Sequence, residues 1–188
     1  MISKNKIFNI ENKSIFIAGH NGMVGTATFN ELKSKSNQLL CVNRKSLDLK
    51  NEEKVLKWFK ENKPQIVIIA AAKVGGIYAN RTYPVDFIEN NLRIQNNVIR
   101  ASHITGVEKL VFLGSSCIYP KHSQQPIKED YLLSGLLEPS NEAYAIAKIA
   151  GIKLCEYYSN QYNCNFISLL PTNLYGPNDN FDPKLSHV

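Results

Sequence analysis

Five short apolar runs, separated by longer amphipathic stretches, set the pattern of this chain. Each run is nearly continuous in apolar residues, which is typical of a strand buried on both faces of a sheet. The runs lie at 14–18, 38–43, 65–70, 109–113 and 165–170. Between them we predict helices at 23–35, from Asp48 (the expected cap) to about 62, at 84–105, and from about 142 to 161. This alternation predicts an α/β fold with a doubly wound parallel sheet covered on both faces.

The remaining segments predict a single domain. Residues 1–13 are expected to form a short polar lead-in, and residues 119–140, with their Pro and Gly, an irregular loop. We find no linker and no internal repeat, and 188 residues can bury a core as one domain.

Composition narrows the class of protein. A hydrophobic content of 44% and a charged content of 20% are typical of a soluble globular protein. The longest apolar run, 66–72, is too short to cross a bilayer, and we expect no signal peptide. The four cysteines have no metal-ligand spacing, so we predict no metal and free thiols in a reducing cytosol. The lysines behind the net charge of +6 are scattered, which argues against nucleic-acid binding.

Three glycines connect the first strand to the first helix, in the order Gly19-His-Asn-Gly22-Met-Val-Gly25. Glycines there permit a tight turn, and the backbone N–H groups of the helix N-terminus can then meet a diphosphate. The spacing is G-x-x-G-x-x-G rather than the commoner G-x-G-x-x-G. We interpret it as a dinucleotide-binding turn, the alternative being a glycine-rich turn without a ligand.

The residues after the second strand indicate which dinucleotide is bound. An acidic residue there would accept a hydrogen bond from a ribose 2′-hydroxyl, whereas arginine suits a 2′-phosphate. The sequence is Cys41-Val-Asn-Arg44-Lys45, with no acid. Arg44 therefore favours NADP over NAD, unless it is simply a surface arginine in a loop.

Tyr144 and Lys148 are four residues apart in an alanine-rich segment, so they share one face of a predicted helix. A unit charge roughly 4 Å from a phenol supplies about 4 kcal/mol, enough to lower the tyrosine pKa into a useful range. The spacing also arises by chance on a solvated helix face. It gains weight from the fourth strand, which delivers Ser115 and Cys117 at its carboxyl end, where ligands bind in open parallel sheets. Ser115 could hydrogen-bond a substrate carbonyl and Cys117 could exchange a proton, although a lone cysteine is more often a core residue.

With these motifs assembled, the chain resembles the extended short-chain dehydrogenases/reductases, which have the Rossmann fold, and within them the GDP-L-fucose synthase group. The most specific segments are Lys73-Val-Gly-Gly76 and Ser115-Ser-Cys-Ile-Tyr-Pro120. They lie within 70–77 and 113–120; the resemblance also rests on 17–25, 141–150 and 171–177, and it covers nearly the whole chain from Ser14.

The resemblance implies NADPH-dependent 3,5-epimerisation and 4-reduction of GDP-4-keto-6-deoxymannose. It implies a reductase triad of Ser115, Tyr144 and Lys148, and an epimerisation acid–base pair of Cys117 and His187. The predicted cofactor-binding residues are Gly19, His20, Asn21, Gly22, Met23, Val24, Gly25, Arg44, Leu113, Gly114, Ser115, Ser116, Lys148, Pro171, Thr172, Asn173, Leu174 and His187. It also implies a cytoplasmic homodimer formed through the helices at 84–105 and 142–161.

The chain departs from the family in two respects. Some relatives carry a basic residue where this chain has Asn21. Family members also continue into a substrate-binding domain, so we expect residues 14–177 to form the NADP-binding domain and 178–188 to lead toward a domain largely absent here. Two alternatives to this function remain: another nucleotide-sugar epimerase or dehydratase of the same family, or an inactive NADP-binding partner subunit.

Overall fold

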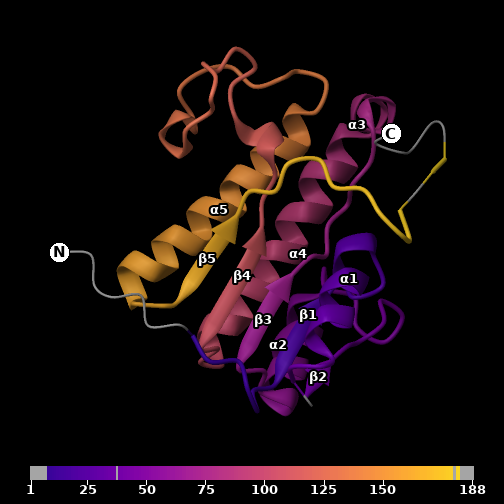
Figure 1. Ribbon diagram of the computed structural model, residues 1–188, viewed down its shortest axis with the longest axis vertical. Coiled ribbons are helices and arrows are strands. Elements are labelled where there is room, and N and C mark those ends of the chain that lie inside the picture. The colour runs from indigo at the N-terminus through magenta and orange to yellow at the C-terminus, as the bar shows by residue number, and fades with distance from the viewer. Residues whose placement is uncertain (1–7, 37, 180, 183–188) are drawn as a thin grey trace.

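A five-stranded parallel sheet forms the centre of the molecule (Figure 1). The structure is a computed structural model that describes residues 8–36, 38–179 and 181–182. The strands are β1 (Ile15–Ala18), β2 (Leu39–Leu40), β3 (Ile66–Ile69), β4 (Lys109–Leu113) and β5 (Phe166–Leu169), in the spatial order β2-β1-β3-β4-β5. All four neighbouring pairs are parallel, which confirms the predicted sheet.

The helices follow the predicted alternation, with one addition. They are α1 (Met23–Leu32), α2 (Glu52–Asn62), α3 (Ile77–Thr82), α4 (Pro84–Ile104) and α5 (Glu142–Tyr162). We did not predict α3, because its six residues are too few to produce a helical period. The segment expected to be irregular, 119–140, contains the short 3₁₀ helix Glu129–Tyr131, and another 3₁₀ helix, Ser116–Ile118, directly precedes it.

The cap of α2 corrects the prediction. Asn51, not Asp48, is the N-cap, and its side-chain oxygen accepts a hydrogen bond from the Lys54 N–H at 2.9 Å. Asp48 instead accepts from the Lys50 N–H and closes the preceding turn. Both residues carry the short side-chain oxygen that caps prefer, so sequence spacing alone does not separate them.

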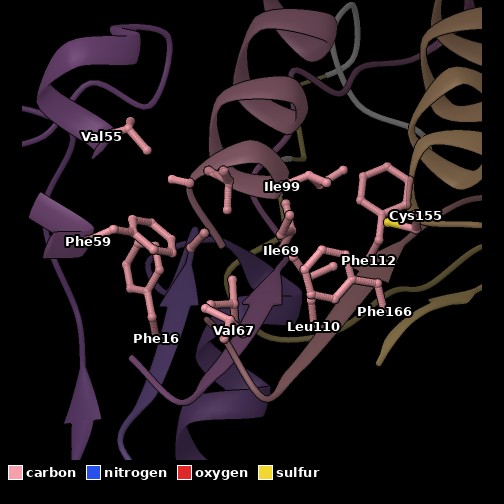
Figure 2. Packing of buried hydrophobic residues seen from close by; sticks show 14 of the residues in the cluster. Phe16, Val55, Phe59, Val67, Ile69, Ile99, Leu110, Phe112, Cys155 and Phe166 are labelled. Atoms are coloured by element: carbon pink, nitrogen blue, oxygen red, sulfur yellow. The ribbon is translucent and has the colours of Figure 1, made fainter. Parts of the chain in front are cut away.

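Two apolar layers cover the sheet unequally. On one face the strands pack against α2, α4 and α5, and Phe16 meets the Phe59 ring at a centroid distance of 5.6 Å (Figure 2). The Trp58 ring lies 4.4 Å from the Phe16 ring. On the other face α1 contributes Phe29 and Leu32 to a smaller cluster. On β5, by contrast, Ile167 and Leu169 remain 38% and 48% exposed, so the predicted cover on both faces is incomplete at this edge.

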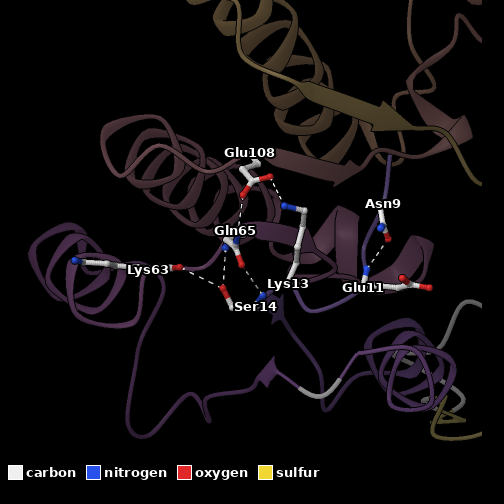
Figure 3. Close-up of polar contacts among 7 residues, drawn as sticks. All are labelled: Asn9, Glu11, Lys13, Ser14, Lys63, Gln65 and Glu108. Carbon is white, nitrogen blue, oxygen red and sulfur yellow. Dashed lines mark hydrogen bonds and ion pairs between the residues drawn. The ribbon is translucent and has the colours of Figure 1, made fainter. Parts of the chain in front are cut away.

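The lead-in residues are fastened to the amino ends of the strands. The Glu108 carboxylate accepts from the Lys13 ammonium at 2.5 Å and from the Gln65 amide at 2.7 Å, and Gln65 in turn accepts from the Ser14 N–H (Figure 3). Phe8 packs against the smaller apolar cluster, so this lead-in is less polar in its contacts than predicted. No helix within the described residues is long and apolar enough to span a membrane.

Candidate functional site

The turn between β1 and α1 requires glycine at two of its three glycine positions. Gly19 has φ +89°, and a Cβ added there would lie 2.6 Å from the Ala71 backbone nitrogen. A Cβ on Gly25 would lie 2.0 Å from the Gly19 carbonyl oxygen. Both glycines are therefore needed for close backbone packing, the first against the end of β3 and the second within the turn itself.

Gly22 differs, because the protein itself leaves room for a side chain there. A Cβ would come no closer than 3.5 Å to any neighbour. Gly22 is the exposed N-cap of α1, no side chain caps this helix, and its first turn holds no acidic residue. The free N–H groups at this N-terminus could hold a phosphate, and a side chain on Gly22 would stand in its way.

One hydrogen bond joins the glycine turn to the loop after β2. The Asn21 side-chain amide donates to the Asn43 side-chain oxygen at 2.8 Å. Arg44 and Lys45 follow immediately, and both are exposed. Arg44, the residue predicted to bind a 2′-phosphate, thus directly follows Asn43, which is hydrogen-bonded to the glycine turn. Residues 41–45 contain two cationic side chains and no acidic one.

The predicted catalytic side chains meet at the carboxyl end of β4. Ser115 is the N-cap of the 3₁₀ helix Ser116–Ile118, and its hydroxyl oxygen accepts from the Cys117 N–H at 3.4 Å. The Ser115 side chain also lies close enough to the Tyr144 phenol and the Cys117 thiol to lower the pKa of both. Ser115, Cys117 and Tyr144 therefore form one polar cluster, although they come from the segment after β4, the 3₁₀ helix and α5.

Burial dominates the electrostatics of this cluster. It raises the pKa of the Tyr144 phenol, and the Cys117 thiol raises it further, against the opposing hydrogen bond of Ser115. Burial likewise raises the pKa of Cys117, although Ser115 and the Lys148 charge oppose it. The expectation that Lys148 lowers the Tyr144 pKa is thus not met, because Lys148 is not among the groups that shift this pKa and the loss of water around the phenol raises it.

Lys148 has a different partner from the one the i, i+4 spacing suggested. Its ammonium donates to the Leu113 carbonyl oxygen at 2.7 Å and lies 5.7 Å from the Tyr144 ring centroid. Burial lowers the pKa of Lys148 to about 8, and the Cys117 thiolate favours its charge. A buried cation at the end of β4 could hold the hydroxyls or phosphate of a nucleotide bound along this edge.

The loop after β5 runs beside the same edge. The Pro171 carbonyl oxygen accepts from the Ser116 N–H at 3.1 Å, and the Leu169 carbonyl accepts from the Gly114 N–H at 2.7 Å. Thr172, Asn173 and Leu174, which follow, are exposed. His187 lies outside the described residues.

Sequence reasoning missed a group of buried residues behind the site. Gln95 is 2% exposed and donates its amide to the Ala147 carbonyl, directly before Lys148. Phe87 meets the Tyr144 ring edge to face at 6.4 Å. The buried amides Asn80 and Asn91 hold the loop after β3. The available signal was the placement of Asn91 and Gln95 four residues apart within the apolar stripe of α4.

Known proteins share this arrangement. The NAD dependent epimerase/dehydratase family matches residues 15–188. The GDP-L-fucose synthase of Sinorhizobium fredii (strain NBRC 101917 / NGR234) is 57% identical over 182 residues, which are 97% of this chain and 58% of that protein.

Two solved structures also superpose well. The GDP-D-glycero-L-gluco-heptose synthase of Campylobacter jejuni, determined in the presence of NADPH, has a TM-score of 0.90 at 47% identity, covering 94% of this chain and 52% of that one. The GDP-L-fucose synthetase of Naegleria fowleri bound to NADP has a TM-score of 0.83 at 31% identity, covering 94% and 58%.

The chain spans about half the length of the relatives that it matches. The residues matched by the family, 15–188, include the glycine turn, the end of β4 and the start of α5. From the family match over residues 15–188 and the shared fold, the chain belongs to the NAD dependent epimerase/dehydratase family.

Proposed function

We propose that this chain is the NADPH-binding, catalytic part of an enzyme that epimerises GDP-4-keto-6-deoxymannose at C3 and C5 and reduces it at C4 to GDP-L-fucose. The observation that carries the proposal is the cluster of Ser115, Cys117 and Tyr144 at the carboxyl end of β4. A serine and tyrosine suffice for a reductase, whereas a thiol in contact with the serine adds a proton-exchange group. The name of the 57% identical relative supports the same reaction.

The cofactor part of the proposal rests on the glycine turn and on the loop after β2. The uncapped, acid-free N-terminus of α1 suits a diphosphate, and the open space at Gly22 suits its close approach. Arg44 and Lys45 suit a 2′-phosphate. Two solved relatives were determined with NADPH or NADP, which supports the choice of cofactor. Residues 14–177 would form the cofactor-binding domain.

In this proposal each residue has one task. The substrate 4-ketone acidifies the protons at C3 and C5, and Cys117 and His187 exchange them. Tyr144, whose raised pKa keeps it protonated at neutral pH, then donates its proton to the C4 oxygen. Bound NADPH would supply the hydride. Lys148, fixed by the Leu113 carbonyl, would hold the nucleotide ribose, and Ser115 would orient the substrate oxygen.

The decisive experiment incubates the purified chain with NADPH and GDP-4-keto-6-deoxymannose in deuterated water. Consumption of NADPH and deuterium at C3 and C5 of the product are expected. Reduction without deuterium incorporation would indicate a reductase lacking the epimerase step. Binding of NADPH without either change would overturn the enzymatic proposal for this chain and favour a cofactor-binding partner subunit. Tyr144→Phe is the matched control, since it should abolish reduction while leaving the buried ring in place.

We further propose a cytoplasmic homodimer joined through α4 and α5. Support comes from large apolar side chains that stay exposed on these two helices, namely Ile104, Ile146, Tyr157 and Tyr162. Light scattering after size-exclusion chromatography should give twice the chain mass of 21.2 kDa. Tyr157→Lys should shift the protein to monomer, and a monomer in the unsubstituted protein would contradict the proposal.

A further inference from the structure

The loop after β3, Lys73-Val-Gly-Gly76, is held in place by hydrogen bonds with Asn91, a buried residue of α4. The Asn91 side-chain oxygen accepts from the Lys73 N–H at 2.7 Å, and its amide nitrogen donates to the Lys73 carbonyl at 2.9 Å. Asn91 is only 2% exposed. One carboxamide therefore satisfies both polar groups of a single backbone residue, which fixes where the Lys73 side chain begins.

A second buried asparagine holds the rest of the loop. The Asn80 amide nitrogen donates to the carbonyl oxygens of Gly75 and Gly76 at 2.8 and 3.1 Å. Asn80 is 6% exposed, and its side-chain oxygen is buried without a hydrogen-bond partner. Burying amides in this way is unfavourable unless they are paired, so two of them beneath one short loop indicate that its conformation matters.

The Lys73 side chain leaves this fixed backbone toward the site. Its ammonium lies 5.8 Å from the centroid of the Phe87 ring, whose other neighbour is the Tyr144 ring at 6.4 Å. Two residues before Lys73, the Ala71 backbone packs against Gly19 of the dinucleotide turn. The backbone of Lys73 therefore lies between the glycine turn and Tyr144, the two ends of the proposed site.

The ammonium of Lys73 has no carboxylate partner among the described residues. The side chain is exposed, and no acidic residue forms an ion pair with it in the described part of the chain. Six other lysines of this part, among them Lys13 and Lys121, do have a carboxylate within ion-pair distance. A positioned cation that contacts an aromatic face but no carboxylate is suited to an anionic ligand.

We propose that Lys73 is a binding residue for a diphosphate, an inference that rests on the proposed nucleotide-sugar chemistry. Both proposed ligands, the dinucleotide and the GDP-sugar, carry this group. The ammonium complements the N–H groups at the uncapped, acid-free N-terminus of α1. The hydrogen bonds of Asn91 and Asn80 already order the backbone of this loop, so Lys73 loses less conformational entropy when a ligand binds.

The test compares Lys73→Met, which keeps the aliphatic stem and removes the charge, with Lys73→Arg, which keeps the charge. Lys57→Met, on the exposed surface of α2, is the control for the change in net charge. NADPH is titrated by fluorescence, and GDP is then titrated calorimetrically in the presence of saturating NADPH. Thermal unfolding verifies that each variant is folded.

Lys73→Met should weaken the binding of one of the two ligands about ten-fold, the equivalent of about 1.4 kcal/mol. Weaker NADPH binding assigns the residue to the cofactor diphosphate, and weaker GDP binding assigns it to the nucleotide-sugar diphosphate. Lys73→Arg and Lys57→Met should bind both ligands nearly as the unsubstituted chain does. The difference between Lys73→Met and the unsubstituted chain should also shrink as salt is added.

Two outcomes separate this inference from the proposed function. If the unsubstituted chain does not bind NADPH at all, the proposed function fails. If it binds NADPH and Lys73→Met binds NADPH equally well, with GDP binding equal or absent in both proteins, the proposed function stands and the role of Lys73 is overturned.

Discussion

The ammonium of Lys148 donates a hydrogen bond to the carbonyl oxygen of Leu113 at 2.7 Å. This contact joins the first half of α5 to the last residue of β4, the strand that leads into Ser115. Lys148 is only 4% exposed, and burial lowers its pKa to about 8. At neutral pH the side chain is still mostly charged, so the cation is retained near the phenol and thiol at a cost in solvation.

The first prediction concerns stability between about pH 8 and pH 10. An unfolded lysine titrates at its ordinary pKa of 10.5, so in this range the unfolded chain holds more protons at Lys148 than the folded chain. The free energy of unfolding should therefore rise with pH, since the penalty for a buried charge is present below about 8 and is relieved above it. The gain should be about 2 kcal/mol.

Urea unfolding across this range measures the effect, with Lys148→Met as the reference protein. The reference retains the other titratable groups, although the Cys117 pKa loses the lowering effect of the Lys148 charge, and it should lack the rise assigned to Lys148. Curves of stability against pH that run parallel for the two proteins would contradict the assignment.

The second prediction separates two glycines of the cofactor turn. Gly25→Ala places a Cβ 2.0 Å from the Gly19 carbonyl oxygen, so we expect a loss of stability of about 3 kcal/mol as the turn shifts. Gly22→Ala meets nothing closer than 3.5 Å and should unfold near the original temperature. It should nevertheless weaken NADPH binding at least about ten-fold, because the methyl group occupies the approach of the diphosphate. Unchanged NADPH affinity in folded Gly22→Ala would argue against this binding mode.

Much of the fold followed from the sequence because the strands are short, apolar and regularly spaced. The boundaries of β3 and β4 were predicted to within one residue or two, since flanking Pro64 and Gly106 punctuate the chain. Features decided by tertiary contacts were missed. The helix α3 contains the buried Asn80, and β2 pairs over only two residues although the predicted strand is six residues long.

The candidate site, like the fold, was predicted only in part, and the features that depend on tertiary contacts were missed. Ser115, Cys117 and Tyr144 were predicted together because the carboxyl ends of parallel strands meet at one edge. The direction of the Tyr144 pKa was wrong, because helix spacing shows which side chains are neighbours but not how much water they lose. Asn91 and Gln95 carried no motif beyond their place in the apolar stripe of α4, and their burial and hydrogen bonds identify them as supports of the site.

The third prediction concerns the choice between NADPH and NADH. Asn43 accepts the hydrogen bond of Asn21 and precedes Arg44. Asn43→Asp should keep this acceptor while adding a negative charge, which repels a 2′-phosphate and accepts from a 2′-hydroxyl. The ratio of NADPH to NADH affinity should fall about ten-fold in Asn43→Asp and in Arg44→Ser. A ratio that neither substitution changes would show that the loop after β2 does not contact the 2′ position.

The fourth prediction tests the amide behind the catalytic helix. Gln95 donates to the Ala147 carbonyl at 2.7 Å while almost fully buried. Gln95→Met keeps the length of the side chain but removes this donor, so we expect a loss of about 1–2 kcal/mol in the free energy of unfolding. Hydrogen exchange at the start of α5 should accelerate. Gln161→Met, at an exposed position of α5, is the control and should change neither the free energy of unfolding nor the hydrogen exchange.

The last prediction tests Cys117 as the proton-exchange group. Cys117→Ser preserves the size of the side chain and its proximity to Ser115, but a hydroxyl is a far weaker acid than a thiol. Exchange of the C3 and C5 protons with solvent should be lost, and NADPH affinity should be unchanged because Tyr144, Lys148 and the glycine turn are intact. Cys164→Ser, at the amino end of β5, should behave like the unsubstituted chain in both assays. A large loss of NADPH affinity in Cys117→Ser would show that the thiol supports the cofactor site rather than the substrate. Exchange that persists in Cys117→Ser would assign the proton transfer to another group.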